Sequence, residues 1–288
     1  MAERVASPLA RSADREGLAE PGDAAQVRVR VHCSYHKCLT VYFRRVVGTL
    51  LNRLLPLRGG HRHFNSDLEA FRREHRRFRV SSINNRALDP DELAGADHDG
   101  AAVRITRFVR DPRDLVVSGY FYHRRGAEPW TRIEDPTPAD WEFANGVVPE
   151  GLRRRGGSFA AYLQQSSLEE GLLAELEFRR EHFRSMASWP ERDPRVRLWR
   201  YEEILGDEAR VFGELLTFLG LGPIERRLGV WLARRHAMGR AGGRRAERDG
   251  HVRDPSPQQW KRHFTPRVHA AFLDEHRAVL EQLGYPVD

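Results

Sequence analysis

Short strand-like segments alternate with longer segments of helical periodicity from residue 27 onward, and this alternation limits the possible fold more than any other feature. The strand-like segments are predicted at residues 27–31, 78–83, 102–109 and 196–201. Helices are predicted at residues 41–55, 67–77, 114–123, 159–165, 168–187, 207–219, 224–236 and 266–283. Strands that alternate with helices predict an α/β three-layer sandwich with a central parallel sheet.

The chain has 288 residues, enough for one large domain with a sizeable core. No internal repeat or linker follows residue 27, so residues 27–288 are predicted to form one domain. Residues 1–26 are rich in Ala, Arg, Glu, Gly and Pro and lack the apolar stretch of a signal peptide, which predicts a disordered tail. No apolar run approaches the roughly 20 residues of a membrane span. We therefore expect a cytoplasmic protein without a membrane partner.

Two further segments carry weaker signals. The only cysteines, Cys33 and Cys38, are too few for a disulfide framework or a zinc quartet, which favours a reducing compartment. Residues 125–157 contain Trp130, Trp141, proline and glycine with little periodicity, which predicts a long loop or lid. Such a lid could shape either an apolar or an anionic pocket.

The charge pattern favours a small anionic ligand. The formal net charge is +7 and the isoelectric point is about 9.9, but basic residues are spread along the whole chain with acids between them. A nucleic-acid-binding protein more often concentrates its charge on one element, so no nucleic-acid partner is expected. Of the 48 basic residues only Lys37 and Lys261 are lysine, and lysine offers a compact charge that the planar fork of arginine cannot copy.

The segment His36–Tyr42 joins the first predicted strand to the first predicted helix. A lysine in such a turn can direct its ammonium group toward a phosphate, and the first backbone N–H groups of the helix point the same way. Thr40 adds a hydroxyl donor. The alternative is a surface lysine in an ordinary turn. The Walker pattern of P-loop nucleotide hydrolases is absent, which disfavours an enzyme of that class.

A second candidate site begins where the strand at 102–109 ends. Arg110 is followed by Asp111 and Pro112, a typical helix start, and Ser118 lies eight residues after Arg110. A guanidinium group can fork onto a phosphate while a nearby hydroxyl donates a further hydrogen bond. The alternative is an arginine paired with a neighbouring aspartate and a serine that faces solvent.

These segments resemble motifs of the PAPS-dependent sulfotransferases (PAPS is 3′-phosphoadenosine 5′-phosphosulfate). The first is similar to their 5′-phosphosulfate loop, P-K-S-G-T-T-W: Lys37 and Thr40 match, and Tyr42 replaces a tryptophan that stacks on adenine. Leu39 replaces a glycine. Glycine at this position lets the backbone approach phosphate closely. The resemblance implies that the 5′ end of the donor is held by Lys37, Cys38, Leu39, Thr40, Val41 and Tyr42.

Three later segments complete the resemblance. The run from Arg107 to Tyr120 is similar to the family's 3′-phosphate motif and implies that Arg110 and Ser118 bind the 3′-phosphate. Residues 199–203 match a stretch whose tyrosine, here Tyr201, reaches the adenine. The run 253–265 matches a segment that closes over the 3′-phosphate with an arginine, here Arg253. Both glycines of that segment are replaced, by Pro255 and Gln258. The implied fold is the P-loop-like sulfotransferase sandwich.

The resemblance implies transfer of a sulfuryl group from PAPS to a hydroxyl or amine by in-line displacement, with PAP (3′,5′-adenosine bisphosphate) as product. Lys37 is expected to stabilise charge on the bridging and equatorial oxygens. No metal is expected, and the acceptor is expected to be a small molecule or a glycan. The oligomeric state stays open.

The acceptor must also lose a proton, which a general base would assist. Many family members place a histidine in the strand that precedes the 3′-phosphate motif, but the corresponding residues 81–85 contain none. His63 is the first candidate in its place and His123 the second. The alternative for either residue is a solvated loop histidine.

Three other functions stay open. A phosphotransferase of the same fold class should carry the missing Walker pattern. A basic module that binds nucleic acid or a polyanionic glycan should show clustered charge and a strong dependence on salt. A degenerate sulfotransferase would bind PAP or PAPS without turnover, as the altered loop and the missing histidine suggest.

Overall fold

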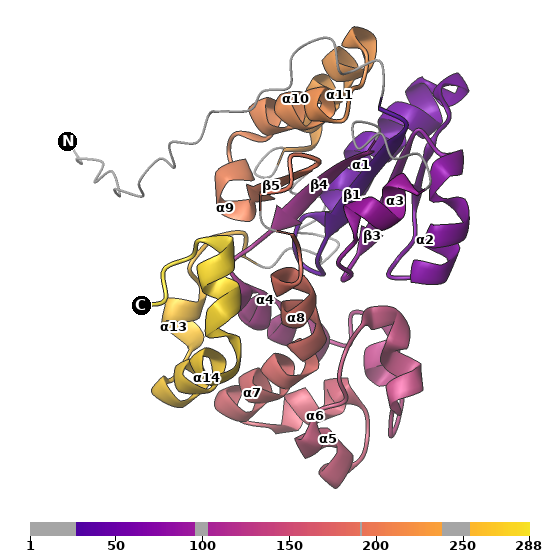
Figure 1. Ribbon diagram of the computed structural model, residues 1–288. Helices are drawn as coiled ribbons and strands as arrows, with labels where there is room; N and C mark the ends of the chain where they lie inside the picture. The colour runs from indigo at the N-terminus through magenta and orange to yellow at the C-terminus, as the bar shows by residue number, and fades with distance from the viewer. Residues whose placement is uncertain (1–26, 96–102, 191, 238–253) are drawn as a thin grey trace, which may run out of the picture.

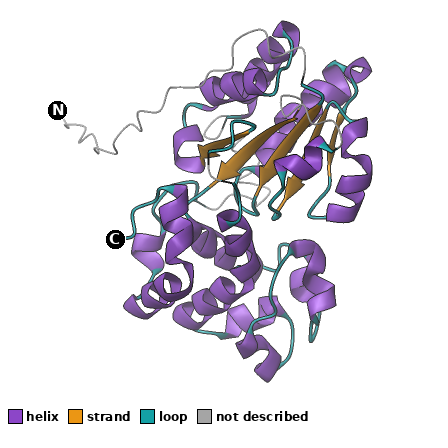
Figure 2. Ribbon diagram, in the orientation of Figure 1, coloured by secondary structure: helices purple, strands orange, loops and turns teal. Residues whose placement is uncertain are grey.

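The computed structural model describes residues 27–95, 103–190, 192–237 and 254–288, so Arg253 and residues 1–26 lie outside the described part of the chain. Its centre is a five-stranded sheet in which every pair of neighbours is parallel, in the order β2-β3-β1-β4-β5 (Figure 2). The strands are β1 (Val29–Ser34), β2 (His61–His63), β3 (Val80–Asn84), β4 (Val103–Val109) and β5 (Val196–Arg200). With helices on both faces, this sheet confirms the predicted fold class.

The helical segments of the described chain range in length from three to 18 residues, and η marks those of 3-10 or π type. Before β5 they are α1 (Thr40–Thr49), η2 (Leu50–Leu54), η3 (Pro56–Arg58), α2 (Leu68–Glu74), η4 (His75–Arg77), α3 (Pro90–Ala94), α4 (Pro112–Arg124), η6 (Pro129–Arg132), η7 (Pro138–Ala144), α5 (Glu150–Arg155), α6 (Phe159–Gln165), α7 (Leu168–Phe178) and α8 (Arg180–Ala187). After β5 they are α9 (Tyr201–Ile204), α10 (Glu208–Phe218), α11 (Pro223–His236), α13 (Trp260–His263) and α14 (Pro266–Leu283). None of these described helices combines the length with the apolar character needed to cross a bilayer.

The two faces of the sheet bury two separate apolar clusters, because alternate side chains of a strand point to opposite faces. On one face Val31 and Ile105 pack with Phe71 of α2. On the other face Phe108 packs with Phe43 of α1 and with α10. The strands β1 and β4 are buried along their whole length, as expected for a parallel sheet covered on both sides.

The register of the strands brings several loops to one edge of the sheet. Ser34, the last residue of β1, pairs with Asn84 of β3 on one side and with Phe108 of β4 on the other. The turn after β1 and the start of α4 after β4 therefore emerge side by side at the carboxyl ends of the strands. In Figure 1 this edge faces the helical half of the molecule that contains α4, α7, α8 and α14.

Several features of this architecture differ from the sequence prediction. Residues 61–63 form an additional edge strand, β2, which the sequence does not reveal because three residues carry no readable alternation. The helix predicted over 168–187 is interrupted at Arg179, where α7 ends and α8 begins. Arg179 is fully buried and forms an ion pair with Glu175, so its side chain serves the interior of the molecule.

Residues 125–157 are not the long loop predicted from their composition. They form η6, η7 and α5, and Trp130 and Trp141 are 5% and 0% exposed. Both indole rings pack against Phe159 and Phe178 in the helical half. The two tryptophans therefore belong to the apolar core, because burying their large rings outweighs the local turn signals.

Candidate functional site

The turn between β1 and α1 has a tightly defined backbone. The N–H of Cys38 donates to the carbonyl of Tyr35 at 2.9 Å, and the Thr40 hydroxyl lies 2.7 Å from that of Ser34. Lys37 and Leu39 both adopt left-handed backbone angles, with φ of 71° and 58°. Each costs a non-glycine residue about 1 kcal/mol or more, and such conformations cluster at functional sites. Leu39, the N-cap of α1, thus occupies a conformation that glycine adopts easily.

Lys37 is held above α4 rather than in solvent. Its Nζ lies 3.8 Å from the centroid of the Tyr122 ring, an arrangement that favours a cation. Burial lowers the pKa of Lys37 to about 7, and the nearby positive charges of Arg110 and Arg179 lower it further than Glu128 can offset. Positive charge is therefore in excess around this ammonium group, and an anion bound there would stabilise its charged form.

Arg110 lies at the same edge of the sheet, directly after β4. It is 3% exposed; its Nη2 donates to the carbonyl of Ser256 at 3.2 Å and lies 3.6 Å from Asp114. Its guanidinium carbon lies 4.2 Å from the centroid of the Tyr201 ring. The Nε of Arg110 has no hydrogen-bond partner among the described residues. A buried, partly unsatisfied guanidinium is suited to an anionic ligand.

The segment 254–260 is fastened over the start of α4. Asp114 accepts the N–H groups of Gln258 at 2.7 Å and Trp260 at 3.0 Å, and the Tyr201 hydroxyl donates to the carbonyl of Pro255 at 2.8 Å. Ser118, one helical turn beyond Asp114, is partly exposed on α4. The structure thus brings Arg110, Tyr201 and this segment together, whereas Arg253 lies outside the described residues.

The remaining loop residues have different surroundings. Cys38 is fully buried, which raises the pKa of its thiol well above the usual range, and Val41 is half exposed. Tyr42 is 8% exposed, with its hydroxyl donating to the carbonyl of Ala233 on α11 and its ring edge-on to Phe212. In this arrangement Tyr42 is a core residue, and stacking on an adenine would require its neighbours to move.

His63 lies away from this site. It ends β2, which β3 separates from β1, and its Nδ1 lies 3.0 Å from the Ser82 hydroxyl. Burial, together with the positive charge of Arg44 and the neighbouring His61, lowers the pKa of His63 to about 3. An imidazole with so low a pKa is a poor proton acceptor, so neither the position nor the basicity of His63 favours a role as general base.

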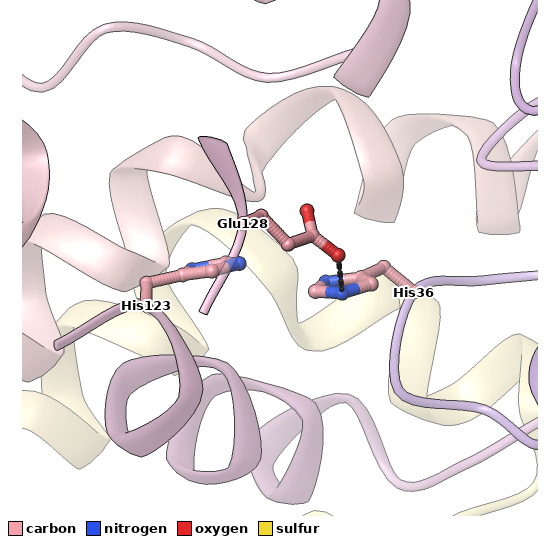
Figure 3. Close-up of side chains that lie close together, drawn as sticks. All are labelled: His36, His123 and Glu128. Atoms are coloured by element: carbon pink, nitrogen blue, oxygen red, sulfur yellow. Dashed lines mark hydrogen bonds and ion pairs between the residues drawn. The ribbon is translucent and has the colours of Figure 1, made fainter. Parts of the chain in front are cut away.

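Three residues that sequence reasoning did not connect lie beside Lys37. The Nε2 of His36 lies 3.1 Å from Oε1 of Glu128, and the rings of His36 and His123 stack with centroids 5.2 Å apart (Figure 3). Burial lowers the pKa of His36 to about 4, although the carboxylate of Glu128 raises it, so this imidazole is neutral at pH 7. We call His36, His123 and Glu128 the His–His–Glu cluster.

A buried ion pair supports this cluster from behind. The Nδ1 of His123 lies 2.7 Å from Oε2 of Glu175, and the Nε of Arg179 donates to Oε1 of Glu175 at 2.8 Å. All three side chains are fully buried. The only sequence signal for this arrangement is the spacing of Glu175 and Arg179 by four residues, which places them on one face of a helix.

Comparisons with known proteins bear on the fold. No family model matches the chain, and no curated protein matches it by sequence. Mouse sulfotransferase SULT7A1 complexed with PAP aligns with 88% of this chain and 84% of its own, with a TM-score of 0.50 and 17% identity. Retinol dehydratase in a complex with retinol and PAP aligns with 90% of this chain and 85% of its own, with a TM-score of 0.46 and 16% identity.

The first of these alignments spans most of both chains. At 17% identity the likeness concerns the fold and leaves the activity open. It agrees with the five-stranded parallel sheet and its helices on both faces. The chain therefore has the fold of the sulfotransferases.

Proposed function

We propose that the chain transfers a sulfuryl group from PAPS to a hydroxyl or amine acceptor. The observation that carries this proposal is the pair of cationic residues, partly buried Lys37 and buried Arg110, at the carboxyl ends of two adjacent strands of a sulfotransferase fold. Ligands of parallel α/β sheets bind outside the carboxyl ends of the strands, and two positive charges held there away from bulk solvent suit a ligand with two anionic ends.

The donor would lie across these two strand ends. Its 5′-phosphosulfate would meet Lys37, the Thr40 hydroxyl and the first N–H groups of α1, including those of Val41 and Tyr42. Its 3′-phosphate would meet Arg110 and Ser118, with Arg253 closing over it. Tyr201, under the guanidinium of Arg110, is the candidate contact for the adenine. Residues 27–288 would act together as one sulfotransferase domain.

In the transfer step the acceptor oxygen or nitrogen attacks sulfur while the bond from sulfur to the bridging phosphate oxygen breaks. PAP leaves with the electron pair of that bond, and the proton of the acceptor is released. Negative charge grows on the bridging oxygen, and the ammonium group of Lys37 is the group of this chain that would stabilise it. A positive charge fixed before the reaction stabilises the transition state without the cost of reorienting solvent.

A direct test incubates the purified chain with PAPS and a library of small-molecule and glycan acceptors and reads sulfated products by mass spectrometry. A parallel thermal-shift assay compares PAP, ATP and an oligonucleotide as ligands. Sulfated product together with stabilisation by PAP supports the proposal. Stabilisation by PAP without any product would identify a degenerate sulfotransferase, and preference for ATP or the oligonucleotide would overturn PAPS as donor.

Replacing Arg110 tests the binding site for the 3′-phosphate. Arg110→Ala is expected to weaken PAP binding about 10- to 100-fold, because a hydrogen bond from a charged group contributes about 1.5–3 kcal/mol. Isothermal titration should show a much smaller loss for adenosine 5′-phosphate, which lacks the 3′-phosphate. Equal losses for both nucleotides would place Arg110 elsewhere in the site. Arg154→Ala, an exposed change on α5, is the control.

Replacing His63 tests whether it acts as general base. His63→Gln is expected to keep kcat within about threefold of the unmodified chain, because His63 lies away from the site. Loss of a true general base would typically lower kcat by about 10²–10⁴-fold. Glutamine can retain the hydrogen bond to Ser82, so the fold should persist. A hundredfold loss of kcat with an unchanged melting temperature would restore His63 as the base.

A further inference from the structure

The His–His–Glu cluster joins three separate segments of the chain. His36 comes from the turn after β1, His123 from the last turn of α4, and Glu128 from the residues that lead into η6. One potential ligand atom from each residue lies within 4.8 Å of the other two (Figure 3). Ligands about 2.0–2.2 Å from a tetrahedral zinc ion are about 3.4 Å apart, so shifts of about an ångström would complete the site.

A second observation concerns the free nitrogen of His123. Its Nε2 is buried without a hydrogen-bond partner among the described residues, and Figure 3 shows the ring directed toward Glu128. Its other nitrogen, Nδ1, is fixed by Glu175 at 2.7 Å, and Glu175 is in turn fixed by Arg179. Histidines that bind metals almost always donate their second ring N–H to a carboxylate or carbonyl in this way.

We propose that His36, His123 and Glu128 bind one divalent ion of the zinc class. Two imidazoles and one carboxylate form a set of three protein ligands that leaves the fourth position of a tetrahedral ion open. Imidazole ligands select zinc and neighbouring transition metals over magnesium and calcium. Glu175 acts as the outer carboxylate that orients His123. The proposed site goes beyond sulfuryl transfer and does not depend on it.

The charges around the cluster influence which further ligand the ion can bind. Lys37 and Arg179 face it with positive charge, and Glu128 and Glu175 offset them. The ion therefore adds to the excess of positive charge beside Lys37. An anion at the open fourth position, such as hydroxide, would lower this excess, so the site suits an ion that binds together with an anionic ligand.

Cobalt provides a spectroscopic test that needs no enzyme assay. The full chain, prepared without a histidine tag and treated with a chelator, is titrated with Co²⁺ while visible absorption is recorded, and Zn²⁺ is then added as a competitor. We expect one equivalent of Co²⁺ with the intense bands of four- or five-coordinate cobalt, displaced by Zn²⁺. His123→Ala should abolish these bands, and Glu175→Gln should weaken binding about 10- to 100-fold.

The control is His269→Ala on α14, because the Nε2 of His269 likewise has no partner among the described residues. It should bind Co²⁺ like the unmodified chain. If His123→Ala fails to fold, Glu128→Gln, a partly exposed position, replaces it. The metal site would be overturned if the unmodified chain shows no cobalt bands. It would also be overturned if the bands persist in His123→Ala and in Glu128→Gln. Since turnover is not measured, this outcome is independent of whether the chain transfers sulfuryl groups.

Discussion

Lys37→Ala is expected to lower kcat for sulfuryl transfer by at least about a hundredfold, the scale seen when one preorganised group that stabilises transition-state charge is removed. The position of Lys37 explains the size of this effect. It is partly buried in the turn after β1 and lies near Arg110 and Arg179, where positive charge is in excess. Alanine leaves no positively charged group in that turn to meet the charge that grows on the bridging oxygen. Single-turnover kinetics with PAPS would measure the chemical step.

Two variants make this test specific. Lys37→Arg is expected to restore little activity, because the planar guanidinium cannot replace a compact ammonium in a turn this tight. Lys261→Ala removes the only other lysine of the chain, which is exposed on α13, and should leave kcat unchanged. If Lys37→Ala retains its affinity for PAP and turns over near the normal rate, Lys37 has no role in the mechanism.

The architecture and the placement of the two candidate anion-binding residues could be predicted from the sequence, because both depend on local patterns. The alternation of strands and helices determines a parallel sheet, and a parallel sheet brings its carboxyl ends to one edge. Lys37 and Arg110 each follow closely on a predicted strand. Asp111 and Pro112 begin α4 as expected, with the proline in the first turn.

The structure explains how the chain accommodates two departures from the family pattern, which the sequence alone does not reveal. Leu39 and Gln258 stand where the family has glycine, and both have positive φ, 58° and 60°. The backbone thus keeps the conformation that glycine favours and bears the strain of a side chain there. At Gln258 the N–H donates to Asp114, so this backbone donor is used to fasten the segment to α4.

The rest of the site could not be predicted because it depends on contacts between distant segments. His36, His123 and Glu128 come from three separate turns, and no spacing in the sequence connects them. Trp130 and Trp141 resemble loop residues because their neighbours are turn formers, yet packing against the aromatic residues of α6 and α7 decides their position. The place of His63 in the sequence favours it as a base, whereas the strand order separates it from the turn after β1.

Arg179→Met is expected to reduce the free energy of unfolding by about 3–5 kcal/mol, the usual cost of leaving one partner of a buried ion pair without the other. Arg179 and Glu175 are both fully buried, and the Arg179 Nε donates to Oε1 of Glu175 at 2.8 Å. Methionine fills much of the space but leaves the Glu175 carboxylate facing the imidazole of His123 without the guanidinium. Urea denaturation followed by circular dichroism would measure the loss.

A double variant separates charge from packing at this position. Glu175→Gln combined with Arg179→Met removes both charges, while glutamine can still accept the N–H of His123. If the uncompensated charge causes the destabilisation, the double variant should recover at least half of the loss, about 1.5–2.5 kcal/mol. If the single and double variants are equally unstable, the guanidinium matters through its packing against α4, where a Cβ added at Gly119 would lie 2.2 Å from Nη2 of Arg179. The double-mutant cycle therefore determines whether the helix break at Arg179 serves to neutralise Glu175 or to fill the space beside α4.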